Sequence, residues 1–226
     1  MLIAEDLLLL IYDDETGKPM VGNPGLDYAL AGAVLIELTM LGKVDSAGAG
    51  EAVKKDRLIV RDETPTGDLL LDKRLALLVG REGAKPKNVI DKVSKKLRPE
   101  LLERLNAKGV LTADKGKVLG LFPVTRWPAQ DASHELEVRA SLESALKLGM
   151  QPDDRTAALI ALLHALNVVP KVVTDAVDKK ALKRRAKEIA ESAWAAEAVR
   201  QAVAAVQAAL TAAIVASTAA GASGGS

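Results

Sequence analysis

Residues 24–42, PGLDYALAGAVLIELTMLG, form the segment that most directly indicates the fold. Proline is favoured in the first turn of a helix and glycine just beyond its end, so Pro24 and Gly42 frame a predicted helix. The residues between them are apolar nearly all round, which is typical of a helix that is buried on every side. This segment therefore predicts a buried helix.

Glu37 lies within this apolar segment. A carboxylate among apolar neighbours needs hydrogen-bond partners, so we expect Glu37 to bind the end of a neighbouring helix. A catalytic acid is the alternative, but the sequence shows no partner group for it. A second set of carboxylates lies in RDETPTGDLLLD at 61–72, where Thr66 or Asp68 is expected to cap the following helix.

The composition favours helices packed on helices. The chain has 226 residues, of which 49% are hydrophobic and only 2% aromatic, and alanine, leucine and valine dominate. We predict a mainly α fold in a single domain over 1–220, with a disordered tail at 221–226. The predicted helices cover 2–12, 24–42, 69–79, 87–107, 135–149, 152–169 and 175–203, and one strand is predicted within 56–63.

The alanine-rich run at 202–220 is uncharged and 19 residues long, which is enough to cross a bilayer. Its larger apolar residues, however, recur at helical spacing along one face, as Val203, Val206, Leu210 and Ile214. We therefore expect an amphipathic helix that faces the core. The apolar N-terminus carries Glu5 and Asp6 and lacks a basic leader, so it does not resemble a signal peptide.

Charge and cysteine content narrow the functional classes. The chain has no cysteine, which excludes disulfides and thiolate metal sites and suits a cytoplasmic location. The net charge is +1, so no nucleic-acid partner is expected. Neither a metal-binding motif nor a cofactor-binding motif is present, and we expect no metal and no cofactor.

Two basic clusters are the more informative charged features. KVSKKLRPE at 92–100 supplies Lys92, Lys95 and Lys96, which would share one face of a helix at spacing i, i+3 and i+4. DKKALKRRAKE at 178–188 is the second cluster. Taken alone, each is typical of a solvated helix face.

The segment GKVLGLFPVTRWPAQ, residues 116–130, holds two of the five aromatic residues of the chain. Two prolines prevent it from being a helix. We predict a β-hairpin with strands at 110–112 and 117–122 around ADKG. An exposed hairpin that carries Leu121, Phe122 and Trp127 beside basic clusters suits a membrane surface. Trp127 either enters the membrane or folds back to cover the domain.

Five stretches resemble the Golgi phosphoprotein 3 family, in a bacterial-type form, and they occur in the family order along most of the chain. They are LLLLIYDDETGK at 7–18, LAGAVLIELTMLGKV at 30–44, TPTGDLLLDKRL at 64–75, LNAKGVLTADKGKVLGLF at 105–122 and DRTAALIALLHAL at 154–166. The resemblance implies a helical bundle ringed by amphipathic helices, with one protruding hydrophobic β-hairpin. It also implies a peripheral membrane protein and not an enzyme.

The resemblance further implies a headgroup site for phosphatidylinositol 4-phosphate. In this chain the family's pocket Trp position holds Gly22, its first Arg position holds Ala31, and its two later basic positions hold Lys95 and Arg98. Lys95, Arg98 and Arg126 are the predicted ligand-binding residues. The predicted residues for membrane insertion and self-association in the hairpin are Leu119, Leu121, Phe122 and Trp127.

The expected function is therefore binding of anionic phospholipid headgroups, with phosphatidylinositol 4-phosphate as the lipid that the resemblance implies. The protein is expected to lie on the cytoplasmic face of a membrane. The alternative is a protein–protein adaptor or oligomerisation module that uses the hairpin without specific lipid recognition. A homo-oligomer formed through the hairpin is compatible with both, because it multiplies weak membrane contacts.

Overall fold

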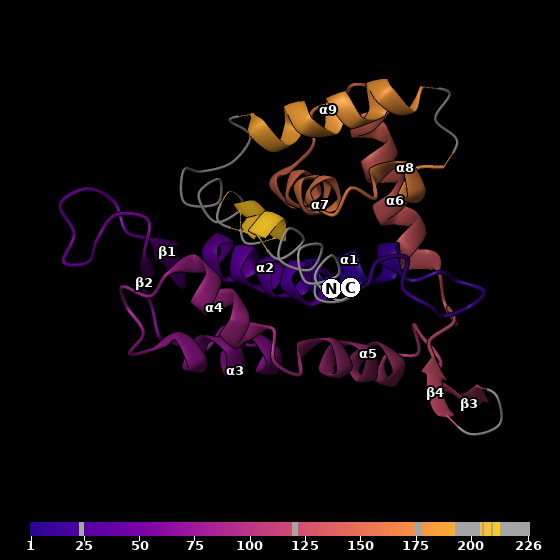
Figure 1. The fold of residues 1–226 in the computed structure, drawn as a ribbon, viewed down its shortest axis with the longest axis horizontal. Helices are drawn as coiled ribbons and strands as arrows, with labels where there is room; N and C mark the ends of the chain where they lie inside the picture. Colours follow the sequence, from indigo (N-terminus) through magenta and orange to yellow (C-terminus); the bar gives the residue numbers. More distant parts are fainter. Residues whose placement is uncertain are drawn as a thin grey trace, which may run out of the picture.

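Helices α1 (Ile3–Ile11) and α2 (Gly25–Met40) form the centre of the protein (Figure 1). The structure is a computed structural model that describes residues 1–22, 25–118, 122–174, 178–192, 204, 206–208 and 210–212. All of α1 is buried, and so is most of α2. The buried helix that the apolar segment at 24–42 predicted is therefore confirmed as α2.

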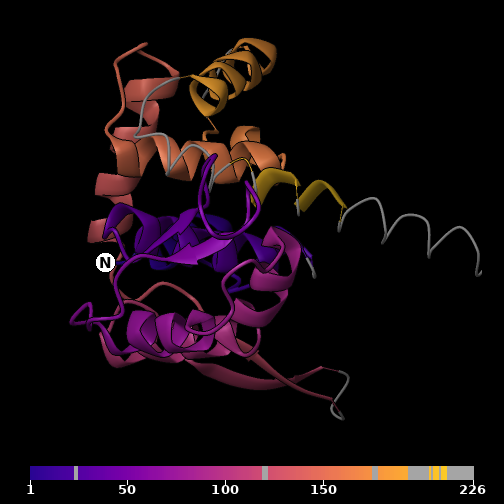
Figure 2. The ribbon, with the colours of Figure 1, turned by 90° about the vertical axis from the view of Figure 1, so that its left-hand side faces the viewer.

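Further helices cover this central pair on two sides (Figures 1 and 2). One side is formed by α3 (Leu69–Leu78), α4 (Pro86–Val93) and α5 (Leu97–Ala107). The other is formed by α6 (Ser133–Leu146), α7 (Asp154–Ala165), α8 (Val169–Val172) and α9 (Lys179–Glu191), with α9 packed on α7. The predicted mainly α fold with a β-hairpin is confirmed.

Two antiparallel strand pairs complete the described fold. Strand β2 (Leu58–Val60) falls within the strand predicted at 56–63, and it pairs with β1 (Val44–Ser46), which the sequence did not predict. The second pair is the hairpin of β3 (Asp114–Val118) and β4 (Phe122–Arg126). It extends away from the helical body beyond the end of α5 (Figures 1 and 2).

The hairpin register differs from the prediction. The ADKG stretch was expected to form the turn, but Asp114, Lys115 and Gly116 lie in the first strand, which ends at Val118, and the second strand begins at Phe122. A bridge between Leu111 and Ala129 sets the register at the base, and the regular pairing from that point carries the strands past ADKG. The predicted hairpin residues Leu119 and Leu121 lie outside the described residues.

The single helix predicted over 87–107 is two helices. It breaks at Lys96, which has a φ of +57° and precedes the first residue of α5. Pro99 has no N–H and is tolerated in the first turn of a helix, so the interruption falls upstream of it. Lys95 and Lys96 consequently lie in the turn between α4 and α5, and the helix face expected to hold them together with Lys92 does not form.

The alanine-rich C-terminal run packs on the central helix at the residues that are described. Residues 204, 206–208 and 210–212 are helical, and Val206 and Leu210 are buried, as the spacing predicted. A Cβ atom at Gly32 would lie 2.2 Å from a methyl group of Val206. The absence of a side chain at Gly32 therefore allows Val206 to pack closely against α2. Across the described ranges, no helix has the length and apolar character needed to cross a bilayer. Val203, Ile214 and the tail at 221–226 fall outside them.

Carboxylates of α1 are held in a buried network of ion pairs. Glu5 is fully buried and lies 2.9 Å from Arg104 Nε and 2.7 Å from Lys108 Nζ, both on the α5 side. Asp6 is 1% exposed and lies 2.9 Å from Arg155 Nη2 and 2.8 Å from His134 Nε2. Paired charges tolerate such burial, and the network joins α1 to both covering layers.

Glu37 belongs to the same network. Its Oε2 accepts a hydrogen bond of 2.6 Å from the backbone N–H of Ile3, and its Oε1 lies 3.1 Å from Arg155 Nη1. The expectation that Glu37 binds the end of a neighbouring helix is therefore confirmed. With these partners, its carboxylate fixes the first turn of α1 against α2 and α7.

Candidate functional site

The turn between α4 and α5 presents the basic residues that the resemblance assigns to the headgroup. Lys95 and Lys96 are exposed, whereas the next residue, Leu97, is fully buried and anchors the turn to the core. Within the described part of the chain, neither lysine forms an ion pair of 4.0 Å or less. Lys95 is therefore available for an external anion.

Arg98, in the first turn of α5, is already paired. Its Nε lies 3.2 Å from Asp27 Oδ1, and both side chains are partly exposed. Tyr12, at the end of α1, lies beside this pair. Burial raises the pKa of the Tyr12 hydroxyl, the Arg98 cation opposes that rise, and Asp27 adds to it. An anion that approaches Arg98 must compete with Asp27.

Gly22 and Ala31 occupy the positions that hold the pocket Trp and the first Arg in the family, and one is exposed while the other is buried. Gly22 is exposed, and a Cβ placed on it would meet no atom within 4 Å, so this position is open surface. Ala31 is fully buried in α2. Of the four positions that the resemblance assigns to the headgroup, only Lys95 and Arg98 bring a positive charge, and they lie on one turn.

The base of the hairpin is fixed to the turn that follows α1. The Trp127 N–H donates to the Gly17 carbonyl at 3.1 Å, and the Ala129 N–H donates to the Asp14 carbonyl at 3.2 Å. The Trp127 side chain is half-buried and packs against the core. Trp127 therefore contacts the domain while part of its side chain stays exposed, and its insertion into a membrane stays a prediction.

The remaining predicted hairpin residues are distributed along the strands. Arg126 is exposed at the base of β4 and pairs in register with Asp114, and Phe122 begins β4 opposite Val118. Arg126 belongs to a different element from Lys95, and α5 lies between the two along the chain. The turn after α1 contacts the neighbours of both in the chain: Tyr12 lies beside Arg98, and Gly17 contacts the backbone of Trp127.

The carboxylates of 61–72 have structural partners. Asp68 caps α3 by accepting from the Leu70 and Leu71 N–H groups, and it pairs with Arg104. Asp72 accepts 2.6 Å hydrogen bonds from both the N–H and the hydroxyl of Thr66. The prediction that either Thr66 or Asp68 caps α3 is thus settled in favour of Asp68.

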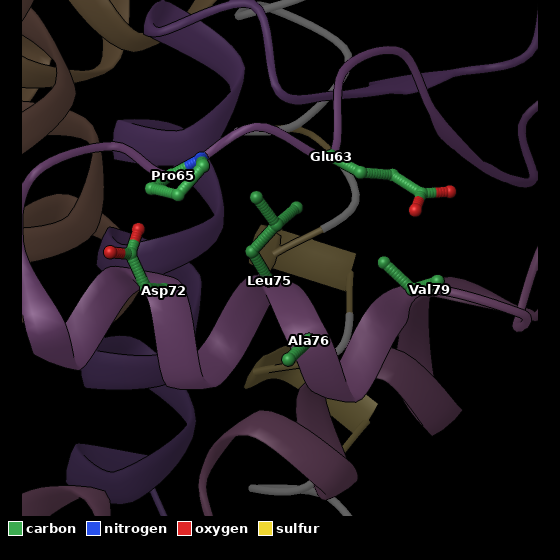
Figure 3. A pocket seen from close by; sticks show the side chains of 6 residues that line it. All are labelled: Glu63, Pro65, Asp72, Leu75, Ala76 and Val79. Carbon is green, nitrogen blue, oxygen red and sulfur yellow. The ribbon is translucent and has the colours of Figure 1, made fainter.

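A shallow pocket of about 350 Å³ lies beside these residues, between α3 and the preceding loop. Figure 3 shows Glu63 at one rim, Asp72 at the other, and Leu75 between them. Its floor is apolar, and Asp72 is engaged by Thr66. In the described ranges, no group of three histidine or carboxylate side chains is arranged to hold a metal ion.

A larger pocket of about 510 Å³ lies between the turn after α1 and the helices α6 and α8. Four of its lining residues are acidic, and Arg139 and Lys171 contribute positive charge. Glu135, which lies beside it and is 3% exposed, accepts from Arg139 Nε at 2.6 Å. Burial raises the pKa of Glu135 to about 7; the Arg139 cation opposes the rise and the nearby Asp14 carboxyl adds to it.

This shift predicts a pH-dependent stability. The folded protein holds a proton on Glu135 that the unfolded chain releases above a pKa of 4.5, so stability falls as pH rises towards 7. We expect the Glu135 contribution to fall by about 2 kcal/mol between pH 5 and pH 7. Urea unfolding of the wild type and of Glu135→Gln at both pH values measures this change in stability, with Glu137→Gln, at an exposed position of the same helix, as the control. Equal pH dependence in the wild type and Glu135→Gln contradicts the prediction.

The arrangement defines a class of protein: a mainly helical domain with an exposed basic turn before α5 and a β-hairpin that projects beyond the other end of this helix. The chain matches the family Golgi phosphoprotein 3 (GPP34) over residues 3–206, and it belongs to that family. It is 30% identical over 203 residues to the vacuolar protein sorting-associated protein 74 of Eremothecium gossypii. That match covers 76% of this chain and 61% of the relative, so the chain spans less than two thirds of the relative's length.

Proposed function

We propose that this protein is a peripheral membrane protein whose α4–α5 turn and hairpin bind anionic phospholipid headgroups on the cytoplasmic face of a membrane. One observation carries the proposal: α5, which begins just after the exposed Lys95, lies on the same side of the central helices as a projecting hairpin whose distal sequence, VLGLFPV at 118–124, has no charged residue. Basic residues attract anionic lipids, while apolar residues enter the interface. Membership of the Golgi phosphoprotein 3 family supports the same reading.

Phosphatidylinositol 4-phosphate is the lipid that the family resemblance suggests. In this chain Gly22 offers no aromatic contact, Ala31 offers no charge, and Arg98 is shared with Asp27. We therefore propose that general anionic charge contributes more to binding than recognition of one headgroup does. Lys95 and Arg126 contact phosphate, and Arg98 does so only in competition with Asp27.

Within this proposal the hairpin supplies the apolar contact. Leu119, Leu121 and Phe122 enter the interface, and Trp127 holds the base of the hairpin against the domain. Association of two copies through the hairpin remains a prediction. Because avidity multiplies weak contacts, such association strengthens membrane binding without any new headgroup contact.

The test is flotation of the protein with vesicles of phosphatidylcholine alone, or with added phosphatidylserine or phosphatidylinositol 4-phosphate. Near an anionic surface each basic residue contributes roughly 1 kcal/mol, so Lys95→Glu with Arg126→Glu is expected to weaken binding by about 30-fold or more. The effect should shrink as salt is raised, because exposed charges are screened.

The matched control is Lys54→Glu with Lys55→Glu, which changes the charge equally at two exposed lysines in the β1–β2 loop. This variant should bind close to the wild-type level. Equal wild-type binding to neutral and anionic vesicles, or no binding to any of them, contradicts the proposed function. A clear preference for phosphatidylinositol 4-phosphate over phosphatidylserine at equal charge contradicts the secondary role given to headgroup recognition.

A further inference from the structure

Helix α9 carries a dense positive charge on one face. It contains six basic and two acidic residues, a net charge of +4 in a chain whose total is +1. Its apolar side chains Leu182, Ala186 and Ile189 are buried. The exposed basic residues recur at helical spacing on another side of the helix and are Lys179, Lys180, Lys183, Arg184 and Lys187. The second basic cluster of the sequence is thus a continuous face.

Few of these charges are neutralised within the protein. The ion pairs of Arg184 with Glu188 and of Lys187 with Glu191 are both 3.9 Å long and exposed. Such pairs contribute little. Among the described residues, no carboxylate lies within 4.0 Å of the ammonium groups of Lys180 and Lys183. The face therefore offers its charge to an external anionic partner.

Exposed aliphatic side chains adjoin this basic face. Leu148 is 73% exposed and Met150 is 58% exposed, both in the turn between α6 and α7. Arg185 of α9 holds that turn, because its guanidinium donates to the carbonyls of Ala145, Gly149 and Met150 at 3.3–3.4 Å. Large aliphatic residues beside a basic helix favour a lipid interface over a soluble acidic partner, since the apolar side chains gain burial there. Asp153 and Asp154 follow this turn at the start of α7 and reduce the local positive charge.

This surface points away from the proposed membrane-binding side. The hairpin and α3–α5 lie on one side of the central helices, and α9 lies on the opposite side in both views (Figures 1 and 2). A single flat bilayer cannot meet both surfaces of one molecule at once.

We infer that α9 and the α6–α7 turn form a second anionic-membrane surface, which allows one molecule to hold two bilayers together. The inference rests on the proposed function, which supplies the first membrane contact. Basic residues of α9 attract the second bilayer, and Leu148 and Met150 enter its interface. The consequence is vesicle clustering in addition to vesicle binding.

The experiment measures both properties on the full chain. Vesicles of phosphatidylcholine and phosphatidylserine are mixed with protein, binding is read by flotation, and clustering by light scattering. Lys180→Glu with Lys183→Glu is expected to lower clustering by about tenfold or more while most flotation is kept. Leu148→Ser should lower clustering without changing the charge, and Lys54→Glu with Lys55→Glu serves as the charge-matched control.

The outcomes separate the two proposals. Wild-type protein that floats with vesicles but does not cluster them overturns the second surface and leaves the first intact. Clustering that survives the α9 substitutions also overturns it, and assigns clustering to association of protein copies. Absence of flotation contradicts the proposed function itself. Clustering that is lost in the α9 variant and retained in the control supports the inference.

Discussion

Replacing Arg155 by methionine should lower the free energy of unfolding by about 3 kcal/mol, because it leaves Asp6 and Glu37 without their shared cation. Arg155 lies 2.9 Å from Asp6 and 3.1 Å from Glu37, and Asp6 is only 1% exposed. Breaking a buried pair from one side costs about 3–5 kcal/mol. The lower end applies because the Arg155 side chain is 35% exposed, so water reaches part of the site.

Urea unfolding measures this loss, with Arg184→Met as the matched control, since Arg184 is 73% exposed and only weakly paired. The control should stay within about 0.5 kcal/mol of the wild type. Adding Asp6→Asn and Glu37→Gln to Arg155→Met should recover part of the stability, because the uncompensated charges are then gone. If Arg155→Met is as stable as the control, the three charges do not depend on one another.

Gly17→Ala is expected to cost about 3 kcal/mol and to detach the base of the hairpin. Gly17 has a φ of +60°, and an added Cβ would lie 2.3 Å from the Trp127 nitrogen and 2.6 Å from the Pro128 nitrogen. Backbone atoms cannot rotate away as side-chain ends do. The left-handed conformation costs alanine about 1 kcal/mol relative to glycine, and overpacking adds roughly 1–3 kcal/mol.

Gly42→Ala is the control that separates these two costs. Gly42 has a similar φ of +68°, but nothing lies within 4 Å of the position its Cβ would take. Its substitution should cost only about 1 kcal/mol. Urea unfolding gives the two losses, and limited proteolysis shows whether cleavage near Trp127 increases in Gly17→Ala alone. Equal losses in the two variants would falsify the claim that close contact with Trp127 matters.

Elements with strong periodicity or composition were predictable from the sequence. The apolar run at 24–42 gave α2 and its burial, and the Asp68 cap follows from simple rules of helix initiation. Glu37 was assigned a core role for the physical reason that holds in the structure, since a buried carboxylate needs partners. In these places local preference and tertiary packing agree.

Local signals failed where tertiary contacts override them. The 87–107 segment has a continuous apolar period, yet Lys96 adopts a left-handed conformation that divides it into α4 and α5. ADKG has the composition of a turn, but pairing that begins at Leu111 and Ala129 draws it into a strand. Strand β1 is three residues long and too short to show a period.

The sequence predicted the basic residues of the candidate site but not the residues that contact them. Lys95 and Arg98 follow from the basic cluster and the family resemblance, but the partners of Arg98 do not. Asp27 and Tyr12 are 71 and 86 residues away from Arg98 in the chain, and only the packing of α1, α2 and α5 brings them together. Sequence spacing carries no signal for such a contact. The same holds for the pairing of Arg155 with Asp6.

The attachment of the hairpin to the turn after α1 has a mechanical consequence. Backbone hydrogen bonds to Gly17 and Asp14 fix the outgoing strand, and the Thr112 N–H donates to the Pro128 carbonyl at 3.0 Å, which ties the two strands together at the same level. These hydrogen bonds hold the hairpin rigidly at its base, so it does not pivot freely there. A force that acts on the hairpin is transmitted as torque to the turn after α1, and from there to α1, all of whose residues are buried.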